Sequence, residues 1–134
     1  MTVIVCVDDD NGMMFNHRRQ SQDKLLRERV ISHLKGNSLW MNIYSAEQFS
    51  DYADSITVDD AFLQKAAPDD YCFVEDQNLT SYLPNINRVI LYKWNRSYPS
   101  DLKFELPLSG WTLLSSIEFP GSSHEKITEE IYAK

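Results

Sequence analysis

Five consecutive apolar residues, Val3 to Val7, constrain the fold more than any other feature of this chain. Most of them are β-branched, and a strand with apolar side chains on both faces has to be covered on both faces. That pattern is typical of a central strand in a parallel sheet with helices on each side. The run stops at Asp8-Asp9-Asp10-Asn11-Gly12, a strong turn sequence.

Shorter runs of the same kind recur along the chain. Further strands are predicted at 39–44, 56–58, 71–74 and 88–94, near Phe104, and at 111–119. Apolar residues at three- and four-residue steps predict a helix over 21–35, with Ser21 as N-cap and Gly36 at its end. Shorter helices are predicted from Ser45, over 59–67 and over 79–83, and 13–20 is predicted to be a loop.

Strands alternate with helices early in the sequence and dominate late. We therefore predict an α/β fold, with a mixed, mostly parallel sheet, flanking helices and a C-terminal antiparallel hairpin. A length of 134 residues predicts a single domain over 1–134.

Charge and hydropathy exclude several classes of partner. Twenty acidic residues against 13 basic ones give a net charge of −7, which argues against nucleic-acid binding. The first residues lack a basic leader, and no apolar run is long enough to span a membrane, so we expect a cytoplasmic protein without membrane contact. Cys6 and Cys72 lie in apolar runs and are expected to be buried, reduced thiols.

Recognisable catalytic motifs are absent. His17, His33 and His124 share no motif, and there is no Gly-x-Ser-x-Gly elbow, so the sequence gives little support to nucleophilic catalysis. A binuclear zinc hydrolase such as ribonuclease Z is excluded because its His-x-His-x-Asp-His run is missing, and no metal site is predicted. The acids at 8–10 could suit Mg²⁺, but a solvated turn is the simpler interpretation.

Two long stretches together resemble dihydrofolate reductase. The first is Val3 to Phe49, where an apolar strand, an acidic turn, a helix with an early acid and a second strand follow one another. The second runs from Ile56 to the C-terminus and carries, in order, DDYCFV, YLP, RVILY, YPSD, GWTLLSS and EIY. The resemblance implies that fold, and it implies that the strands carrying Cys6 and Cys72 lie side by side.

The departures from the family concern the cofactor. Where the family has a Gly-Gly pair that admits the NADPH diphosphate, this chain has Val74, Glu75 and Asp76. Asn42 to Ser45 replace a phosphate-binding run that contains Arg, and an edge strand is missing before Ile56. Bulk and like charge at these positions predict that the NADPH site is lost and that no cofactor is bound.

The positions that resemble the family's pterin site depart less from the family than the cofactor positions do. It implies that Asp23 is the pocket carboxylate with a catalytic role, and that Arg27, Phe49 and Tyr92 line the same ligand site. Asp23 and Arg27 are also spaced as an exposed i, i+4 ion pair on a helix, and this alternative stays open.

These observations predict a reduced dihydrofolate reductase-like domain without NADPH-dependent activity, which binds a pterin-like small molecule or a protein partner. Two alternatives remain. One is a divergent reductase that places its cofactor differently, and the other is an interaction module that forms a homodimer along the exposed sheet edge.

Overall fold

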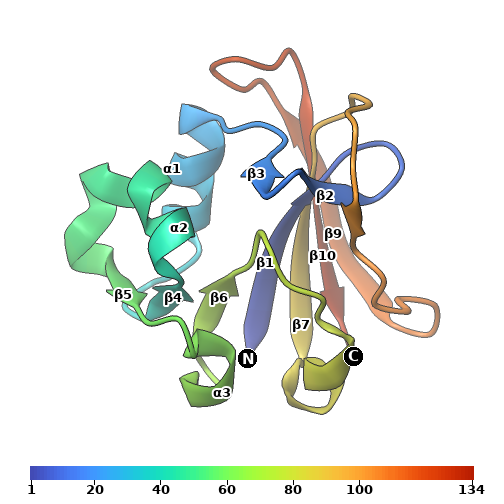
Figure 1. Ribbon diagram of the computed structural model, residues 1–134. Coiled ribbons are helices and arrows are strands. Elements are labelled where there is room, and N and C mark those ends of the chain that lie inside the picture. The colour runs from blue at the N-terminus through green and yellow to red at the C-terminus, as the bar shows by residue number, and fades with distance from the viewer.

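A seven-stranded sheet forms the centre of the molecule, in a computed structural model that describes residues 1–134 (Figure 1). Its strand order is β5-β4-β6-β1-β7-β10-β9. The strands are β1 (Thr2–Val7), β4 (Leu39–Met41), β5 (Ile56–Val58), β6 (Tyr71–Phe73), β7 (Arg88–Lys93), β9 (Thr112–Phe119) and β10 (Ile127–Ala133). The pairings among β5, β4, β6, β1 and β7 are parallel, whereas β10 pairs antiparallel with both β7 and β9. The predicted fold class is confirmed, and the sheet ends at the three-residue strand β5 on the truncated edge.

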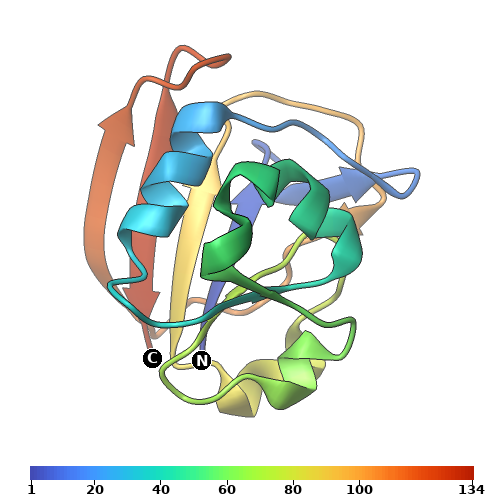
Figure 2. The same cartoon turned by 90° about the vertical axis from the view of Figure 1, so that its left-hand side faces the viewer.

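Both faces of this sheet are covered, as the sequence of β1 requires. Val3, Val5 and Val7 face one core cluster, which also contains residues of α3 (Phe62–Lys65). Ile4 faces the other cluster, formed with α1 (Lys24–Ser32). Figure 2 shows α1 lying over the strands on this second side. The continuous apolar run is thus explained by alternate residues entering two different cores.

The remaining helical segments are short. They are α2 (Ile43–Ala46) and two 3₁₀ segments, η1 (Glu47–Ser55) and η2 (Thr80–Asn85). No helix has the length and apolar character that crossing a membrane requires.

The predicted loop at 13–20 is wrong, because this segment forms a hairpin. β2 (Gly12–Phe15) pairs antiparallel with β3 (Arg18–Arg19) and with β8 (Leu102–Lys103), the strand predicted near Phe104. Asn16 and His17 connect the two strands with φ values of 50° and 60°. Two consecutive positive φ angles are the mark of a tight type I′ hairpin turn, in which Asn is among the favoured residues.

Two helix starts differ from the prediction. Asp23, not Ser21, is the N-cap of α1, and its side chain accepts hydrogen bonds from the backbone N–H groups of Leu25 and Leu26. The strand at Leu39 ends at Met41 because α2 starts at Ile43, two residues earlier than expected, with Asn42 as its N-cap accepting from the N–H of Ser45. In both cases a carboxylate or amide at a position other than the predicted cap accepts the helix's first free N–H groups.

The two cysteines lie on adjacent strands, as the resemblance implied, but they are not neighbours in one core. Cys72 is fully buried with Val3, its register partner, whereas Cys6 is half-buried and packs against the opposite cluster. The sheet therefore separates the two thiols, and the expectation of full burial is confirmed for Cys72 but not for Cys6.

We expect both thiols to react slowly with a bulky thiol reagent in the native protein and rapidly in denaturant. Burial raises the pKa of Cys72 to about 12, and burial together with the charge of Glu75 raises the pKa of Cys6 well above its ordinary value. Because the thiolate is the reactive form, both effects suppress labelling near neutral pH. Stoichiometric labelling of either cysteine in the folded protein, followed by mass spectrometry, would contradict this expectation.

Candidate functional site

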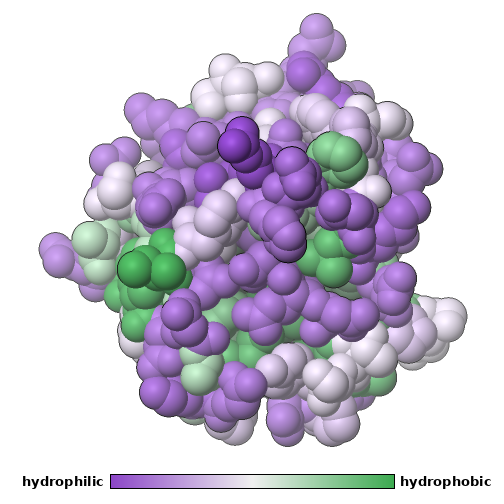
Figure 3. All heavy atoms as spheres, viewed as in Figure 1, coloured by the Kyte–Doolittle hydropathy of each residue, from purple (hydrophilic) through white to green (hydrophobic).

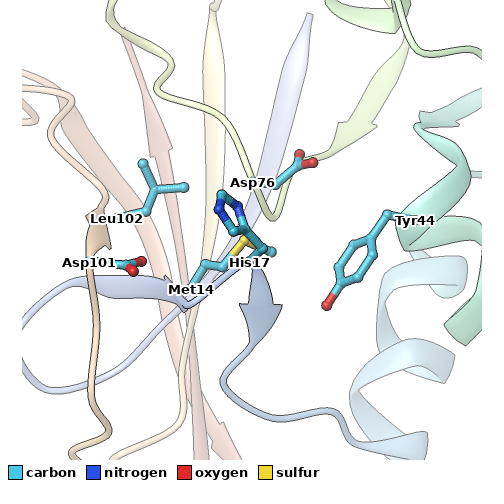
Figure 4. A pocket seen from close by; sticks show the side chains of 6 residues that line it. All are labelled: Met14, His17, Tyr44, Asp76, Asp101 and Leu102. Atoms are coloured by element: carbon cyan, nitrogen blue, oxygen red, sulfur yellow. The ribbon is translucent and has the colours of Figure 1, made fainter.

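An open pocket of about 590 Å³ lies beyond the carboxyl ends of the parallel strands (Figure 4). It is lined by Met14, His17, Tyr44, Asp76, Asp101 and Leu102. Tyr44 follows β4 and Asp76 follows β6, so both side chains start from the strand ends at which open α/β sheets usually bind ligands. Figure 4 shows His17 near the middle, with Asp76 and Tyr44 on one side and Asp101 and Leu102 on the other. We call this site the hairpin pocket, because Met14 and His17 belong to the β2–β3 hairpin.

Two carboxylates of the hairpin pocket are held in place without a cation. The amide Nδ2 of Asn42 lies 2.9 Å from both oxygens of Asp76. Asp101 Oδ2 accepts a hydrogen bond of 3.0 Å from the backbone N–H of Asn16. Neither acid takes part in a salt bridge. The hairpin pocket is therefore acidic, and the carboxylates of Asp76 and Asp101 can accept hydrogen bonds from a ligand.

Beside this pocket, Glu75 forms a paired, buried cluster with Arg19. The guanidinium donates from Nε (2.9 Å) and Nη2 (3.1 Å) to the two oxygens of Glu75, and Ser45 Oγ donates to the same carboxylate at 2.8 Å. Arg19 also lies over the ring of Tyr44, 4.4 Å from its centroid. Burial alone would lower the pKa of Arg19, but the hydrogen bonds and charge of Glu75 raise it. The negative charge of Glu75 is thus balanced by Arg19, and its buried side chain occupies the space beside the hairpin pocket.

Asp23, the predicted pocket acid, is enclosed by the loop between β9 and β10. Only 2% of its surface is exposed. Its carboxylate accepts from the N–H groups of Ser122 (3.0 Å) and Ser123 (2.9 Å) in addition to those of its own helix. A Cβ at Gly121 would collide with the carboxylate, so a glycine permits this close approach of the loop.

The electrostatics of Asp23 are the opposite of those of an acid in an apolar cleft. Burial would raise its pKa, but hydrogen bonds from Ser123, His124 and Ser122 hold the pKa well below its usual range. Asp23 therefore lacks the raised pKa that burial of a carboxyl group in an apolar pocket produces. The alternative of an ion pair with Arg27 is wrong, because Arg27 donates to Gln22 Oε1 at 3.2 Å instead.

Phe49 and Tyr92, the other predicted ligand residues, are fully buried in the core beneath α1. Phe49 packs edge-on against Phe73, and the Tyr92 hydroxyl donates to Glu129 Oε2 at 2.8 Å. The structure therefore does not gather Asp23, Arg27, Phe49 and Tyr92 around one open cavity. Their ligand-binding role stays a prediction, and it requires the 121–124 segment to move away from Asp23.

Glu129 is the centre of a second buried polar cluster. Arg29 donates to its two oxygens at 2.9 and 3.1 Å, and His33 Nε2 lies 2.9 Å from Oε2. With the Tyr92 hydroxyl, these groups join α1 to β7 and β10. This cluster fixes the helix on the sheet, and it was not predicted from the sequence.

A third cluster was also missed by the sequence analysis. His124 Nδ1 lies 2.9 Å from Asp23 Oδ2, and its Nε2 lies 2.9 Å from Ser21 Oγ. The imidazole stacks on Trp94, with ring centroids 4.5 Å apart. Ser21 and His124 are separated by 103 positions, so no local motif could have revealed this arrangement.

The acidic turn after β1 has a structural role. Asp8 is buried and accepts from the N–H groups of Asp10 (2.9 Å) and Gly12 (2.7 Å). No group of three or more His, Cys, Asp or Glu side chains is arranged to hold a metal ion anywhere in residues 1–134.

Comparison with solved structures identifies the fold. A dihydrofolate reductase from Enterococcus faecalis, complexed with NADP(H) and RAB-propyl, superimposes with a TM-score of 0.67 over 98% of this chain and 94% of that chain. The two sequences are 9% identical, so the likeness is one of fold. No protein-family model and no curated protein sequence matches the chain. The molecule has a dihydrofolate reductase-like fold.

Proposed function

We propose that this domain binds a small, planar, amino-bearing molecule of the pterin type in the hairpin pocket, and that it does not use NADPH. The observation that carries the proposal is the pair of acids, Asp76 and Asp101, which line one open pocket without a cationic partner. Carboxylates with free acceptor capacity favour ligands rich in N–H donors.

The chemistry of the pocket suits such a ligand. A 2-amino heterocycle presents two parallel N–H groups, which a carboxylate accepts in a bidentate manner. Tyr44 and Met14 supply an aromatic and a polarisable surface for a flat ring. A volume of about 590 Å³ lies within the range of small-molecule sites.

A dinucleotide phosphate is disfavoured for two reasons. The buried Glu75 side chain and the Arg19 guanidinium fill the space that a Gly-Gly pair leaves open in the resembling family. Asp76 adds an unneutralised negative charge next to them, and like charges oppose the binding of a diphosphate.

Calorimetric titration with a simple pterin, dihydrofolate and NADPH tests the proposal. We expect heat from the pterin and none from NADPH. Asp76→Asn and Asp101→Asn should each weaken pterin binding about tenfold or more, because a charge-assisted hydrogen bond contributes about 1.5–3 kcal/mol. Asp51→Asn is the matched control, since Asp51 is exposed and makes no side-chain hydrogen bond.

Thermal denaturation gives a second measurement. A ligand at about 100 times its Kd stabilises the fold by about 2.7 kcal/mol. A rise in melting temperature with NADPH equal to that with the pterin would contradict the proposal and favour the divergent reductase.

The homodimer remains a second candidate because of an apolar patch near the truncated edge. Ile43 is 67% exposed and Val58 is 46% exposed, and Figure 3 shows hydrophobic residues gathered over the region of α2 and β5. Asp54 is exposed beside this edge, and its negative charge opposes the approach of a second copy, whereas the charge of Asp59 is paired with Lys65 at 2.6 Å. A mass of two chains in sedimentation equilibrium, lost in Ile43→Ser, would support the dimer.

A further inference from the structure

The cluster of Ser21, His124 and Asp23 has the geometry of a nucleophile, a base and an orienting acid. Both contacts of the imidazole measure 2.9 Å, one from Nδ1 to Asp23 Oδ2 and the other from Nε2 to Ser21 Oγ. These are the hydrogen-bond distances at which a base accepts a serine proton and a carboxylate orients that base.

Every member of the cluster is held by its surroundings. Two N–H groups of the loop and two of α1 bond the Asp23 carboxylate, which keeps it ionised at neutral pH. Trp94 stacks on the imidazole at an interplanar angle of 25° and fixes the ring plane. Because an ionised carboxylate only accepts, Nδ1 carries the ring proton and Nε2 faces the Ser21 hydroxyl as an acceptor.

An open cavity of about 380 Å³ lies next to this cluster. Its lining includes Gln20, which precedes Ser21, and Tyr98, whose hydroxyl lies 3.5 Å from His124 Nε2. Phe15 forms an apolar wall and is 46% exposed. Gln20 Oε1 is a buried acceptor without a hydrogen-bond partner, the one such side-chain atom in the molecule.

The charge of the cavity indicates the kind of substrate. Arg18 lines it and makes neither a salt bridge nor a side-chain hydrogen bond, so its guanidinium is free to pair with an anion. Arg19 lies beside it, although its charge is balanced by Glu75. The cavity therefore favours a small molecule with an apolar part and a negative charge, the reverse of the preference of the hairpin pocket.

We propose that Ser21, His124 and Asp23 form a hydrolytic centre for small carboxylic esters that carry a negative charge. The Ser21 oxygen bonds to the ester carbonyl carbon while its proton passes to His124 Nε2. The ester C–O bond then breaks, and the departing alcohol takes that proton. Water attacks the acyl-serine, gives a proton to Nε2 and releases the carboxylic acid, and Ser21 regains the proton.

The remaining residues have defined parts in this reaction. The Tyr98 hydroxyl, within reach of the same ring nitrogen, is placed to donate to the developing oxyanion. Asp23 acts through His124 and is a positioning residue. Ser21 is half-buried and directly follows Gln20, which lines the cavity together with Tyr98, so the ester has to approach Ser21 from that side.

Covalent labelling tests the nucleophile directly. Folded wild-type protein is incubated with an alkyl phosphonofluoridate, which forms a stable bond to an activated serine, and the adduct is located by peptide mass spectrometry. We expect one adduct, at Ser21, which is absent in Ser21→Ala and retained in Ser32→Ala. Ser32 is the matched control, because it is an exposed serine at the far end of α1 and bonds only the carbonyl oxygen of Arg29.

Hydrolysis of an activated ester with and without a carboxylate group gives the second readout. His124→Gln should lower kcat about 10²–10⁴-fold, the usual contribution of a general base. Arg18→Gln should raise KM for the anionic ester and leave the neutral ester unchanged. Circular dichroism confirms that each variant is folded.

Absence of an adduct on folded wild-type protein would overturn the proposal, as would an adduct elsewhere that Ser21→Ala does not remove. Asp76 and Asp101 lie outside this cluster, so their variants should retain the labelling. The hydrolytic centre and the hairpin pocket can therefore fail independently of each other.

Discussion

Replacing Asp23 with alanine is expected to lower the free energy of unfolding by about 3–5 kcal/mol, because its ionised carboxylate accepts several buried hydrogen bonds and each bond to a charged group contributes about 1.5–3 kcal/mol. The carboxylate caps α1, which alone contributes about 1 kcal/mol. It also joins that helix to the β9–β10 loop through Ser122, Ser123 and His124. Chemical denaturation of wild type, Asp23→Ala and the exposed control Asp51→Ala measures the difference. The control should remain close to wild type.

The pH dependence of this contribution follows from the sign of the shift. The pKa of Asp23 in the folded protein is depressed below its ordinary value of 3.8. Its stabilisation is therefore complete above that value and is lost as the pH falls below it. A loss under about 1 kcal/mol in Asp23→Ala would leave only the capping term. It would mean that the loop does not close over the carboxylate in solution, and it would support an open cleft at Asp23 that can bind a pterin.

The sheet was predictable from the sequence because its central strands are buried on both faces. Val3 to Val7 and the apolar part of β7 are continuous hydrophobic runs, and few other structures accommodate such runs in a chain of this length. The β2–β3 hairpin was missed for the opposite reason. It is short, and its other partner is β8, which lies far along the chain.

The clusters that bear chemistry depend on contacts between distant parts of the chain. His124 meets Asp23 across 101 positions and Ser21 across 103, so a search for local motifs finds three unrelated histidines. Asp23 was singled out by the family resemblance as a pocket acid, but its place as the N-cap of α1 and its partners in the β9–β10 loop were not foreseen. The loop that encloses it contains only small and polar residues with no periodic pattern.

Glu129 is a different case, because the sequence does carry a signal for it. It stands between Ile127 and Ile131, and alternation along a strand places all three side chains on one face. An acid on the apolar face of a strand requires partners. The basic residues of α1, Arg29 and His33, are the ones that supply them.

Glu129→Ala is the second substitution with a large expected effect, a loss of about 3 kcal/mol of unfolding free energy. Removing the carboxylate leaves the buried Tyr92 hydroxyl without its acceptor and ends the bidentate bond from Arg29. An unsatisfied buried group costs about 1–3 kcal/mol, and a hydrogen bond to a charged group contributes about 1.5–3 kcal/mol. The Arg29 side chain is partly exposed and can be solvated by water after the substitution. We therefore expect a total loss near the middle of the summed ranges.

Measuring stability as the pH is lowered distinguishes the contribution of Glu129 from the effect of protonating exposed carboxylates. Burial would raise the pKa of Glu129, but hydrogen bonds from His33, Arg29 and Tyr92 lower it from 4.5 to about 2. A depressed carboxyl pKa means that its stabilisation is present above pH 4.5 and is lost as the pH falls toward 2. Wild type should therefore lose stability more steeply across this window than Glu129→Gln. The control Glu118→Gln, which breaks an exposed pair with Lys126, should follow the wild-type curve. Parallel curves for wild type and Glu129→Gln would show that the carboxylate titrates normally and that α1 is held on the sheet by apolar packing alone.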